Sequence, residues 1–314
     1  MSRAPSPQAV PRELAGEPLD AVVRAVFGTS WGKARSWIAS GKVFVDGAPV
    51  TDALRRIGGA AAIELRMNAP RPRTQELARD RFLHVDAHVV VVSKPAGVST
   101  IPYDDAESGT LDELVRAHLA RTSPDARGRP ALGVVHRLDK ETSGVIVFTR
   151  TWLAKKSLTQ QFRDHTVHRR YLAIAHGAVR AQTIRSHLVE DRGDGLRGTS
   201  NRRGGRADAA GQLAITHIEP IERLEGATLV ACRLETGRTH QIRIHLSEAG
   251  HPLVGERVYI RRFPEERRIA APRMMLHAAE LGFEHPASHL PVQWSEAPPD
   301  DFEETRRRLG GRRG

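Results

Sequence analysis

The sequence His136-Arg137-Leu138-Asp139-Lys140-Glu141-Thr142-Ser143-Gly144 lies between two apolar runs, residues 132–135 and 145–148. Short apolar runs bounded by turn-forming residues predict two strands joined by a charged loop. Such a loop can hold a reactive side chain rigidly and leave it open to a substrate. Asp139, flanked by Arg137 and Lys140, is therefore a candidate catalytic carboxylate. On spacing alone, a surface ion pair is the alternative.

This stretch closely resembles the signature motif of the RluA-type family of RNA pseudouridine synthases. The resemblance implies that Asp139 is the catalytic aspartate, Tyr171 the active-site tyrosine and Arg238 the active-site arginine. It also implies that Arg137 helps to fill the gap left by a uridine that is flipped out of its stack. Further segments match the family pattern in the same order, within about residues 82–295: 89–97, 161–177, 235–246, 250–252, 276–278 and 285–286.

Two positions after the matched segment 250–252 depart from the family pattern. Gly255-Glu256 stands where the pattern reads Gly-Asp, and Tyr259-Ile260 stands where it reads Tyr-Gly. Neither position carries the chemistry in the family. The departures therefore bear on the conformation of the loop 261–268 more than on the activity.

The implied site residues have physical roles that suit them, and each has a simpler alternative. Asp139 must be ionised, whether it attacks the sugar or removes a proton from it, and both roles remain open. A nearby arginine favours the charged form, and Arg238 is the candidate partner. Tyr171 could stack on uracil. The alternatives are an ion pair for Arg137, a phosphate contact for Arg238 and a core position for Tyr171.

The composition favours a polyanionic partner. The chain has 314 residues, with 48 Lys and Arg against 37 Asp and Glu, which gives a net charge of +11. Lys and Arg side chains displace counterions from phosphates, so an excess of them makes RNA the natural candidate partner. The alternative is that the organism's proteins are basic in general, which would give the same net charge.

The composition also argues against several classes of protein and site. The single cysteine, Cys232, excludes an intrachain disulfide and favours a cytoplasmic protein. No apolar run has the length of a membrane span, and the 15 histidines are scattered. We therefore expect no metal, no cofactor and no membrane association, and a monomeric enzyme.

Residues 12–68 are predicted to form a small separate module. Helical spacing of apolar residues predicts two helices, and Gly41 is typical of the end of the second. Asp46-Gly47 then predicts a tight hairpin turn. The arrangement resembles the RNA-binding fold first known from ribosomal small-subunit protein four. This resemblance implies RNA contacts by Lys33, Arg35 and Lys42, whereas the alternative is a helical cap with a solvated basic face.

The rest of the chain is predicted to contain one large domain. Short β-rich runs with a few helices, without regular alternation of strand and helix, predict an α+β fold around a mixed, largely antiparallel sheet. The predicted helices cover residues 111–120, 152–162 and 239–249. The predicted boundaries are a disordered N-terminus at 1–11, a linker at 69–81, a catalytic domain at 82–295 and a mobile tail at 296–314.

The segment 191–211 is rich in arginine and small residues, which is typical of a flexible surface loop. Arg197, Arg202 and Arg203 in this segment are predicted to contact the RNA backbone.

The family resemblance predicts an enzyme that isomerises specific uridines to pseudouridine in RNA, with large-subunit ribosomal RNA as the first candidate. The alternatives are a tRNA-modifying enzyme of the same kind and a non-catalytic RNA-binding or ribosome-assembly factor.

Overall fold

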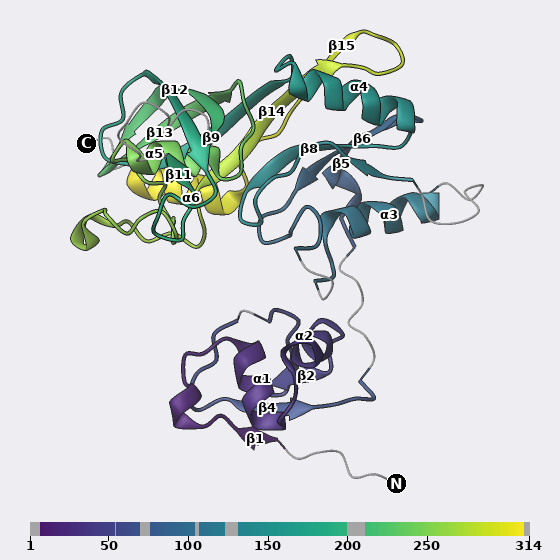
Figure 1. Cartoon of the computed structure of the whole chain (residues 1–314), viewed down its shortest axis with the longest axis vertical. Helices are drawn as coiled ribbons and strands as arrows, with labels where there is room; N and C mark the ends of the chain where they lie inside the picture. Colours follow the sequence, from purple (N-terminus) through teal and green to yellow (C-terminus); the bar gives the residue numbers. More distant parts are fainter. Residues whose placement is uncertain are drawn as a thin grey trace. The chain divides into compact units, whose positions relative to one another are not determined.

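The structure is a computed structural model that describes residues 7–53, 55–69, 76–103, 107–122, 131–199 and 211–310. The chain divides into two compact units, each taken here by itself. The first comprises residues 1–77 and 101–123, and the second comprises residues 78–100 and 124–314 (Figure 1). Helix α3 (Leu111–Thr122), which matches the predicted helix 111–120, is grouped with the first unit.

The N-terminal part of the first unit has the predicted order of helix, helix and hairpin. Helix α1 (Leu19–Phe27) ends at Gly28, which is left-handed with φ +58°. Helix α2 (Trp31–Ala39) begins where the Ser30 hydroxyl accepts a hydrogen bond of 3.3 Å from the Lys33 amide. The strands form a sheet in the order β1-β4-β2-β3. Their bounds are Gln8–Ala9 for β1, Val43–Val45 for β2, Ala48–Pro49 for β3 and Ala62–Leu65 for β4.

The turn between β2 and β3 explains why this hairpin forms. Asp46 has φ +50° and Gly47 has φ +79°, so both central residues are left-handed, as a two-residue turn of this hand requires. The sheet then packs against both helices through one apolar core. Its fully buried members include Leu19, Val22, Val23, Ala34, Ile38, Val43 and Ile63.

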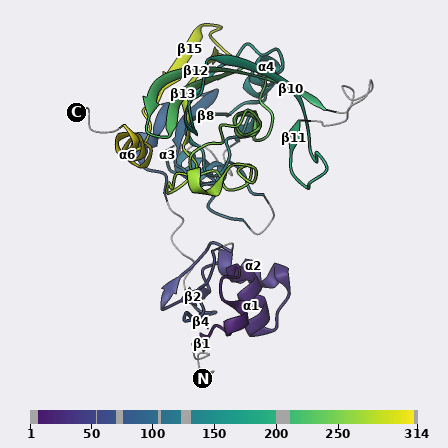
Figure 2. The same ribbon diagram turned by 90° about the vertical axis from the view of Figure 1, so that its left-hand side faces the viewer.

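The second unit is built on one mixed sheet with the order β11-β10-β12-β13-β9-β14-β8-β6-β5, in which β7 pairs with β8 and β15 with β14. All pairings are antiparallel except β8 with β14. Figure 2 shows β10 and β11 at one edge. The strands are β5 (Phe82–Val85), β6 (Val89–Lys94), β7 (Gly133–Val134), β8 (Ser143–Thr149), β9 (His168–His176), β10 (Gln182–Val189), β11 (Gly198–Thr199), β12 (Gln212–Leu224), β13 (Ala227–Leu234), β14 (Leu276–Glu284) and β15 (Pro291–Ser295).

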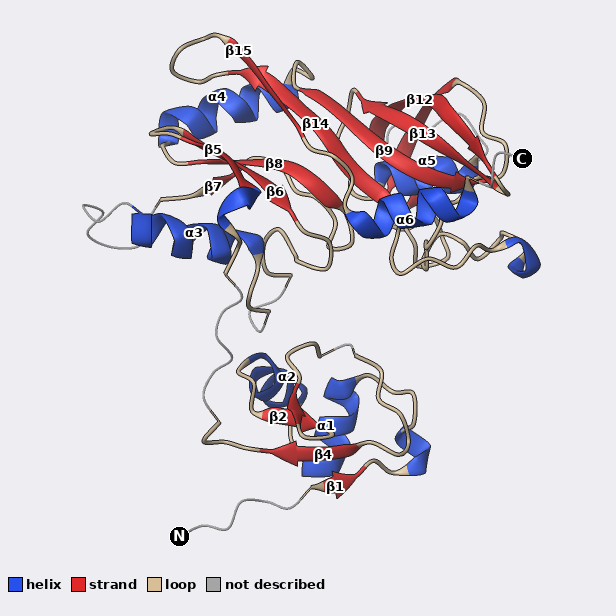
Figure 3. Ribbon diagram, turned by 180° about the vertical axis from the view of Figure 1, so that it is seen from behind, coloured by secondary structure: helices blue, strands red, loops and turns tan. Residues whose placement is uncertain are grey.

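Three helices pack on this sheet. Helix α4 (Trp152–Arg163) contacts β8 and β14 and buries Ala154 and Leu158 in their core. Helix α5 (Gln241–Glu248) contacts β12. Helix α6 (Asp300–Leu309) shares a core with β9 and β13 (Figure 3). The α+β fold with a mixed, largely antiparallel sheet and a small N-terminal module is therefore confirmed.

Two expectations about the chain ends are wrong. The predicted disordered N-terminus 1–11 contains β1, which pairs with β4 through Gln8 and Ile63. The predicted mobile tail 296–314 contains α6, whose Phe302 is fully buried and whose Asp301 pairs with Arg273 at 2.6 Å. The charged composition of this tail concealed an amphipathic helix, because its buried face rests on Phe302, Thr305 and Leu309 alone. Within the predicted linker 69–81, residues 70–75 lie outside the described part.

Candidate active site

The loop that carries Asp139 joins β7 to β8 and is held by backbone contacts on both sides. The Thr100 hydroxyl donates to the carbonyl oxygen of Leu138 at 2.9 Å, and the Gly97 amide donates to that of Lys140 at 2.8 Å. The Thr142 amide then closes a turn on the carbonyl oxygen of Asp139 at 3.0 Å. Asp139 is therefore fixed at both neighbouring peptide groups, as a reactive side chain requires.

Lys94 holds the same loop from the protein interior. Its side chain is fully buried, and its Nζ donates to the carbonyl oxygens of Val98, Lys140 and Pro95 at 2.6, 2.9 and 3.0 Å. Burial lowers the pKa of Lys94 to about 7, while the nearby charge of Asp139 opposes that shift. Three carbonyl acceptors require three N–H donors, which only the ammonium form supplies. We therefore assign a structural role to Lys94: its charged ammonium links the loop after β6 to the loop that carries Asp139.

The side chain of Asp139 faces Arg243 of α5. The Nη1 of Arg243 lies 3.2 Å from Oδ2 of Asp139, and the Asp139 side chain is 25% exposed. The opposite carboxylate, Glu256, binds Arg243 through two bonds of 2.8 and 2.9 Å. Arg243 thus connects a partly open carboxylate to a buried one, which keeps a guanidinium fixed beside the candidate catalytic group.

The register of the sheet brings Tyr171 toward this carboxylate. Gly144, at the start of β8, pairs with Ala278 of β14, and Ala278 pairs in turn with Tyr171 of β9. Gly144 has φ +114°, and a Cβ there would lie 2.1 Å from the carbonyl oxygen of Ala278. Glycine therefore permits the close approach of β8 and β14 just after the Asp139 loop.

Tyr171 and Arg169, two residues apart on β9, are both buried, and the charges of Arg169 and Asp139 act on the phenol. Tyr171 is 9% exposed, and burial raises its pKa to about 12, although the charge of Arg169 opposes this and that of Asp139 adds to it. Arg169 is 5% exposed and donates to the carbonyl oxygen of Glu235 at 2.7 Å. Its Nε is buried without a hydrogen-bond partner in the structure. The phenol therefore stays protonated at neutral pH beside a buried cation.

The prediction that Arg238 is the partner of Asp139 is wrong in this structure. The Nε of Arg238 donates to the carbonyl oxygen of Leu213 at 2.9 Å, and its amide donates to Oε1 of Gln241 at 3.0 Å. Gln241 is itself buried and bonded to β12 through Ile215. Sequence reasoning named only Arg238 of this motif and missed Arg243, because the position of each side chain depends on where α5 begins and how it is directed.

Arg137 and His136 take different places in the same motif. Arg137 is exposed and forms no ion pair or hydrogen bond with another described residue, so it remains available to a ligand. His136 stacks on Phe162 with a centroid distance of 4.7 Å and accepts a bond of 3.2 Å from the Val147 amide. Burial and the charge of Arg169 lower the pKa of His136 to about 3. We therefore assign a structural role to His136.

His240, just before α5, faces the candidate site. Its Nε2 lies 3.9 Å from Oδ1 of Asp139, and its Nδ1 lies 2.7 Å from the Tyr259 hydroxyl. Its backbone is left-handed, with φ +59°, just before α5 begins. Strained backbone at a non-glycine residue is common where a side chain must be aimed at a site. The signal in the sequence was its place between Arg238 and Arg243.

The predicted RNA-contacting residues differ in their surroundings. Lys33 is exposed and lies 5.3 Å from the ring centroid of Trp37. Arg35 binds the buried carboxylate of Asp20 at 2.8 Å, and Lys42 donates to the carbonyl oxygen of Ala69. Arg197 pairs with an exposed glutamate, Glu190, at 2.9 Å. Arg202 and Arg203 lie outside the described residues.

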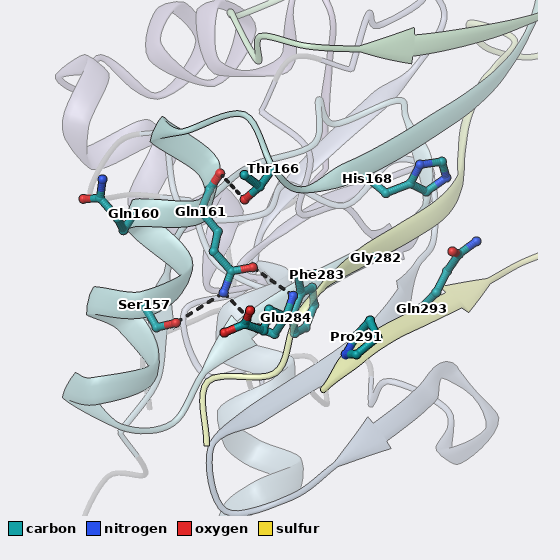
Figure 4. Close-up of a pocket in the computed structure, with 10 residues that line it drawn as sticks. All are labelled: Ser157, Gln160, Gln161, Thr166, His168, Gly282, Phe283, Glu284, Pro291 and Gln293. Atoms are coloured by element: carbon teal, nitrogen blue, oxygen red, sulfur yellow. Dashed lines mark hydrogen bonds between the residues drawn. The ribbon is translucent and has the colours of Figure 1, made fainter. Parts of the chain in front are cut away.

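A hollow of about 550 Å³ lies away from Asp139, between α4, β9, β14 and β15. Figure 4 shows Gln161 reaching from α4 to β14, where its amide exchanges bonds with the backbone of Glu284 at 2.8 and 2.9 Å. Gln160 is bound in turn by Asp164. The polar groups of this hollow are thus largely engaged with one another, and none of the candidate catalytic residues lines it.

Metal-binding clusters and membrane-spanning helices are both absent from the described residues. No group of three or more His, Cys, Asp or Glu side chains there has a geometry that could hold a metal ion. Nor does any helix in the described ranges combine the length and the apolar character needed to cross a membrane.

Comparison with known proteins places this geometry in a family. Residues 88–248 match the family model described as RNA pseudouridylate synthase. "Ribosomal large subunit pseudouridine synthase D" of Pseudomonas aeruginosa is 34% identical over 307 residues, which cover 93% of this chain and 92% of the relative. The chain belongs to the RluA-type family of RNA pseudouridine synthases. It is therefore an isomerase that converts uridine to pseudouridine in RNA.

Other relatives agree with this assignment. "Ribosomal large subunit pseudouridine synthase D" of Xylella fastidiosa is 37% identical over 307 residues, covering 93% of this chain and 89% of the relative. The solved structure "Human RNA Pseudouridylate Synthase Domain Containing 4" matches with a TM-score of 0.57 and 22% identity, over 73% of this chain and 93% of that one. This last likeness bears on the fold alone, and it agrees with the sheet described above.

Proposed function

We propose that this pseudouridine synthase modifies uridine in large-subunit ribosomal RNA, with Asp139 as the catalytic group. The observation that carries the role of Asp139 is its position: a carboxylate 25% exposed, held by its own loop and paired at 3.2 Å with Arg243. The RNA target is supported by relatives named as ribosomal large subunit pseudouridine synthases, which align over 93% of this chain. An alignment of that length must include the N-terminal module.

The reaction breaks the bond between ribose carbon 1′ and uracil N1, and the electron pair leaves with the base. The sugar is then rejoined to uracil carbon 5, whose proton is lost while N1 gains one. Asp139 acts on the sugar either as a nucleophile at carbon 1′ or as a base. Arg243 orients the carboxylate and balances its charge, because the guanidinium is held in place and bonds to Oδ2 of Asp139.

Tyr171 and Arg137 serve the flipped base in this proposal. The ring of Tyr171 forms the wall on which uracil stacks, and its phenol, protonated at neutral pH, is a hydrogen-bond donor. Arg137 is exposed beside the Asp139 loop, where a guanidinium can occupy the gap that the flipped nucleotide leaves. Arg238 contacts the RNA backbone at the mouth of α5.

The N-terminal module anchors the RNA through phosphate contacts that carry no sequence information. In the module, Lys33, Arg35 and Lys42 supply positive charge. In the other unit, Arg197, Arg202 and Arg203 of the segment 191–211 supply further phosphate contacts. We propose that the chain acts in the cytoplasm and as a monomer. One chain is sufficient to supply Asp139, Tyr171 and Arg243, which all belong to the same unit.

Asp139→Asn tests the central claim, because it removes the charge without changing the shape of the side chain. We expect loss of tritium release from RNA labelled at uracil carbon 5, with RNA affinity nearly unchanged. Glu141→Gln is the matched control, since it neutralises an exposed carboxylate in the same loop and should remain active. Wild-type turnover by Asp139→Asn would remove Asp139 from the mechanism.

The RNA target is tested by mapping pseudouridine in total RNA from cells with and without the gene. A site lost from large-subunit ribosomal RNA, and restored by the wild-type gene but not by Asp139→Asn, would support the proposal. Loss of a site from tRNA alone would replace the proposed target with tRNA.

A further inference from the structure

Glu256 is a buried carboxylate at the end of the connection that follows α5. Its side chain is only 1% exposed. Gly255, just before it, has φ +81°, and a Cβ at that position would lie 1.9 Å from the carbonyl oxygen of Arg273. The backbone that delivers Glu256 is therefore packed so closely that its position is fixed.

Both oxygens of Glu256 bind the guanidinium of Arg243, and Oε1 also binds the turn that follows. Oε2 accepts from Nε of Arg243 at 2.8 Å, whereas Oε1 accepts from Nη2 of the same guanidinium at 2.9 Å. Oε1 also accepts from the amides of Arg257, Val258 and Tyr259 at 3.0, 2.8 and 3.3 Å. One carboxylate thus holds the fork of Arg243 and folds the turn at residues 257–259 around itself.

The folded turn brings Tyr259 to the other side of the site. Its ring lies 5.1 Å from the Arg243 guanidinium carbon, and its hydroxyl lies 2.7 Å from Nδ1 of His240. Arg243 and His240 are the two side chains that face the oxygens of Asp139, at 3.2 and 3.9 Å. Both groups that flank Asp139 are therefore held, directly or through Tyr259, by Glu256.

The charge of this carboxylate is matched to its surroundings. Burial alone would raise the pKa of Glu256, but the bonds and charge of Arg243 and the amides of Val258 and Tyr259 outweigh it and hold the pKa below its usual value. Burial lowers the pKa of His240, although the charge of Asp139 opposes this, so the imidazole is neutral at neutral pH. Of the two side chains, Arg243 is therefore the one that places a positive charge beside Asp139.

We infer that Glu256 is a positioning residue for isomerisation, which sets the orientation of Arg243 directly and of His240 through Tyr259, and so fixes the carboxylate of Asp139. This inference rests on the proposed catalytic role of Asp139. Glu256 lies at a position where this chain departs from the Gly-Asp pattern that it otherwise resembles, and the longer side chain reaches both Arg243 and the turn.

Glu256→Gln and Glu256→Asp form a matched pair for the test. The amide keeps the size of glutamate but loses the charge and one acceptor, whereas aspartate keeps the charge and loses reach. Replacing the outer hydrogen-bond partner of a metal-binding side chain costs about 10- to 100-fold in activity, and Glu256 is an outer partner of the same kind for Arg243. In the tritium-release assay we expect kcat of Glu256→Gln to fall by about that factor. The KM for RNA should change by less than about threefold, and Glu256→Asp should recover part of kcat.

Tyr259→Phe separates the second arm of the arrangement. It removes only the hydroxyl that bonds to His240 and leaves the ring against Arg243. The loss of one such bond should lower kcat by about 2- to 10-fold, again with little change in KM. Wild-type kcat in this variant would overturn the part of the inference that passes through Tyr259.

The outcomes separate a positioning role from a structural one. Melting temperatures are measured for every variant, and kinetics are run well below them. Wild-type kcat in Glu256→Gln overturns the inference, and so does a loss that appears in KM alone or is as large in Glu256→Asp. If Glu256→Gln does not fold, Glu256→Asp decides: lower kcat at unchanged KM supports positioning, and wild-type kcat overturns it. Activity in Asp139→Asn would instead mark failure of the proposed function itself.

Discussion

Replacing Arg243 by lysine distinguishes the arginine found beside Asp139 from the one that the sequence suggested. Arg243 makes one bond to Asp139 and two to Glu256, from three different nitrogens of a rigid fork. Lysine keeps the positive charge, so Glu256 is not left buried without a counterion, which would cost about 3–5 kcal/mol of stability. A single ammonium cannot reproduce the three directed bonds.

The expected effect on catalysis follows from the bond that is lost. A hydrogen bond to a charged group contributes about 1.5–3 kcal/mol. If Arg243→Lys gives up the bond to Asp139, kcat should therefore fall by about 10- to 150-fold, because about 1.4 kcal/mol corresponds to a factor of ten. Tritium release under saturating RNA measures kcat, and urea unfolding shows whether the fold is retained.

Arg238→Lys is the matched control, with the same chemical change five positions earlier. Its Nε bonds only to the carbonyl oxygen of Leu213, so we expect the change to appear in KM and to leave kcat within about threefold. A larger fall of kcat in Arg238→Lys than in Arg243→Lys would refute the reasoning. It would mean that Arg238 pairs with Asp139 once RNA is bound.

Three further predictions concern the rest of the chain. Lys33→Ala should reduce the salt slope of RNA binding by about one unit without loss of stability, whereas Arg35→Ala should also lower the free energy of unfolding, because it leaves Asp20 buried without its partner; binding curves over a salt series and urea melts test both. Cys232 is buried, which raises its pKa to about 12, so iodoacetamide at pH 8 should modify it only in urea, as mass spectrometry would show. His136 has a folded pKa of about 3, lowered by burial and a neighbouring arginine, against about 6.5 when unfolded. The unfolded state then binds the extra proton, so the free energy of unfolding should fall below pH 6.5, by up to about 1.4 kcal/mol per unit from this group, and less steeply in His136→Gln.

The sequence predicted the elements that short-range chemistry decides. Asp46-Gly47 defines its hairpin, because both residues tolerate the left-handed conformation that the turn requires. The helices 111–120 and 152–162 were recognisable from apolar spacing and were found at α3 and α4. Asp139 and Tyr171 were named as candidates by motif resemblance, and Ala278 pairs both with Tyr171 and with Gly144 at the start of the strand that follows Asp139.

The contacts that sequence reasoning missed depend on distant parts of the chain. Arg243 lies 104 residues from Asp139, and its neighbour Glu256 was noticed only as a departure from a pattern. Which arginine of Arg238 and Arg243 faces Asp139 depends on where α5 begins and on how Gln241 fastens it to β12. Helix α6 was missed because only a few of its residues are apolar. Its buried face can be recognised only when the core formed with β9 and β13 is known.

The order of the strands in the large sheet has a consequence for how the enzyme is made. Strand β14 lies between β8 and β9 in the sheet, although residues 276–284 come at least a hundred positions after both strands in the chain. Domains leave the ribosome from the N-terminus and fold as units. Until β14 has been synthesised, the strands that carry Tyr171 and follow Asp139 have no common neighbour. We therefore expect a nascent chain that stops before residue 276 to have no isomerase activity, so that catalysis begins only after β14 has been made.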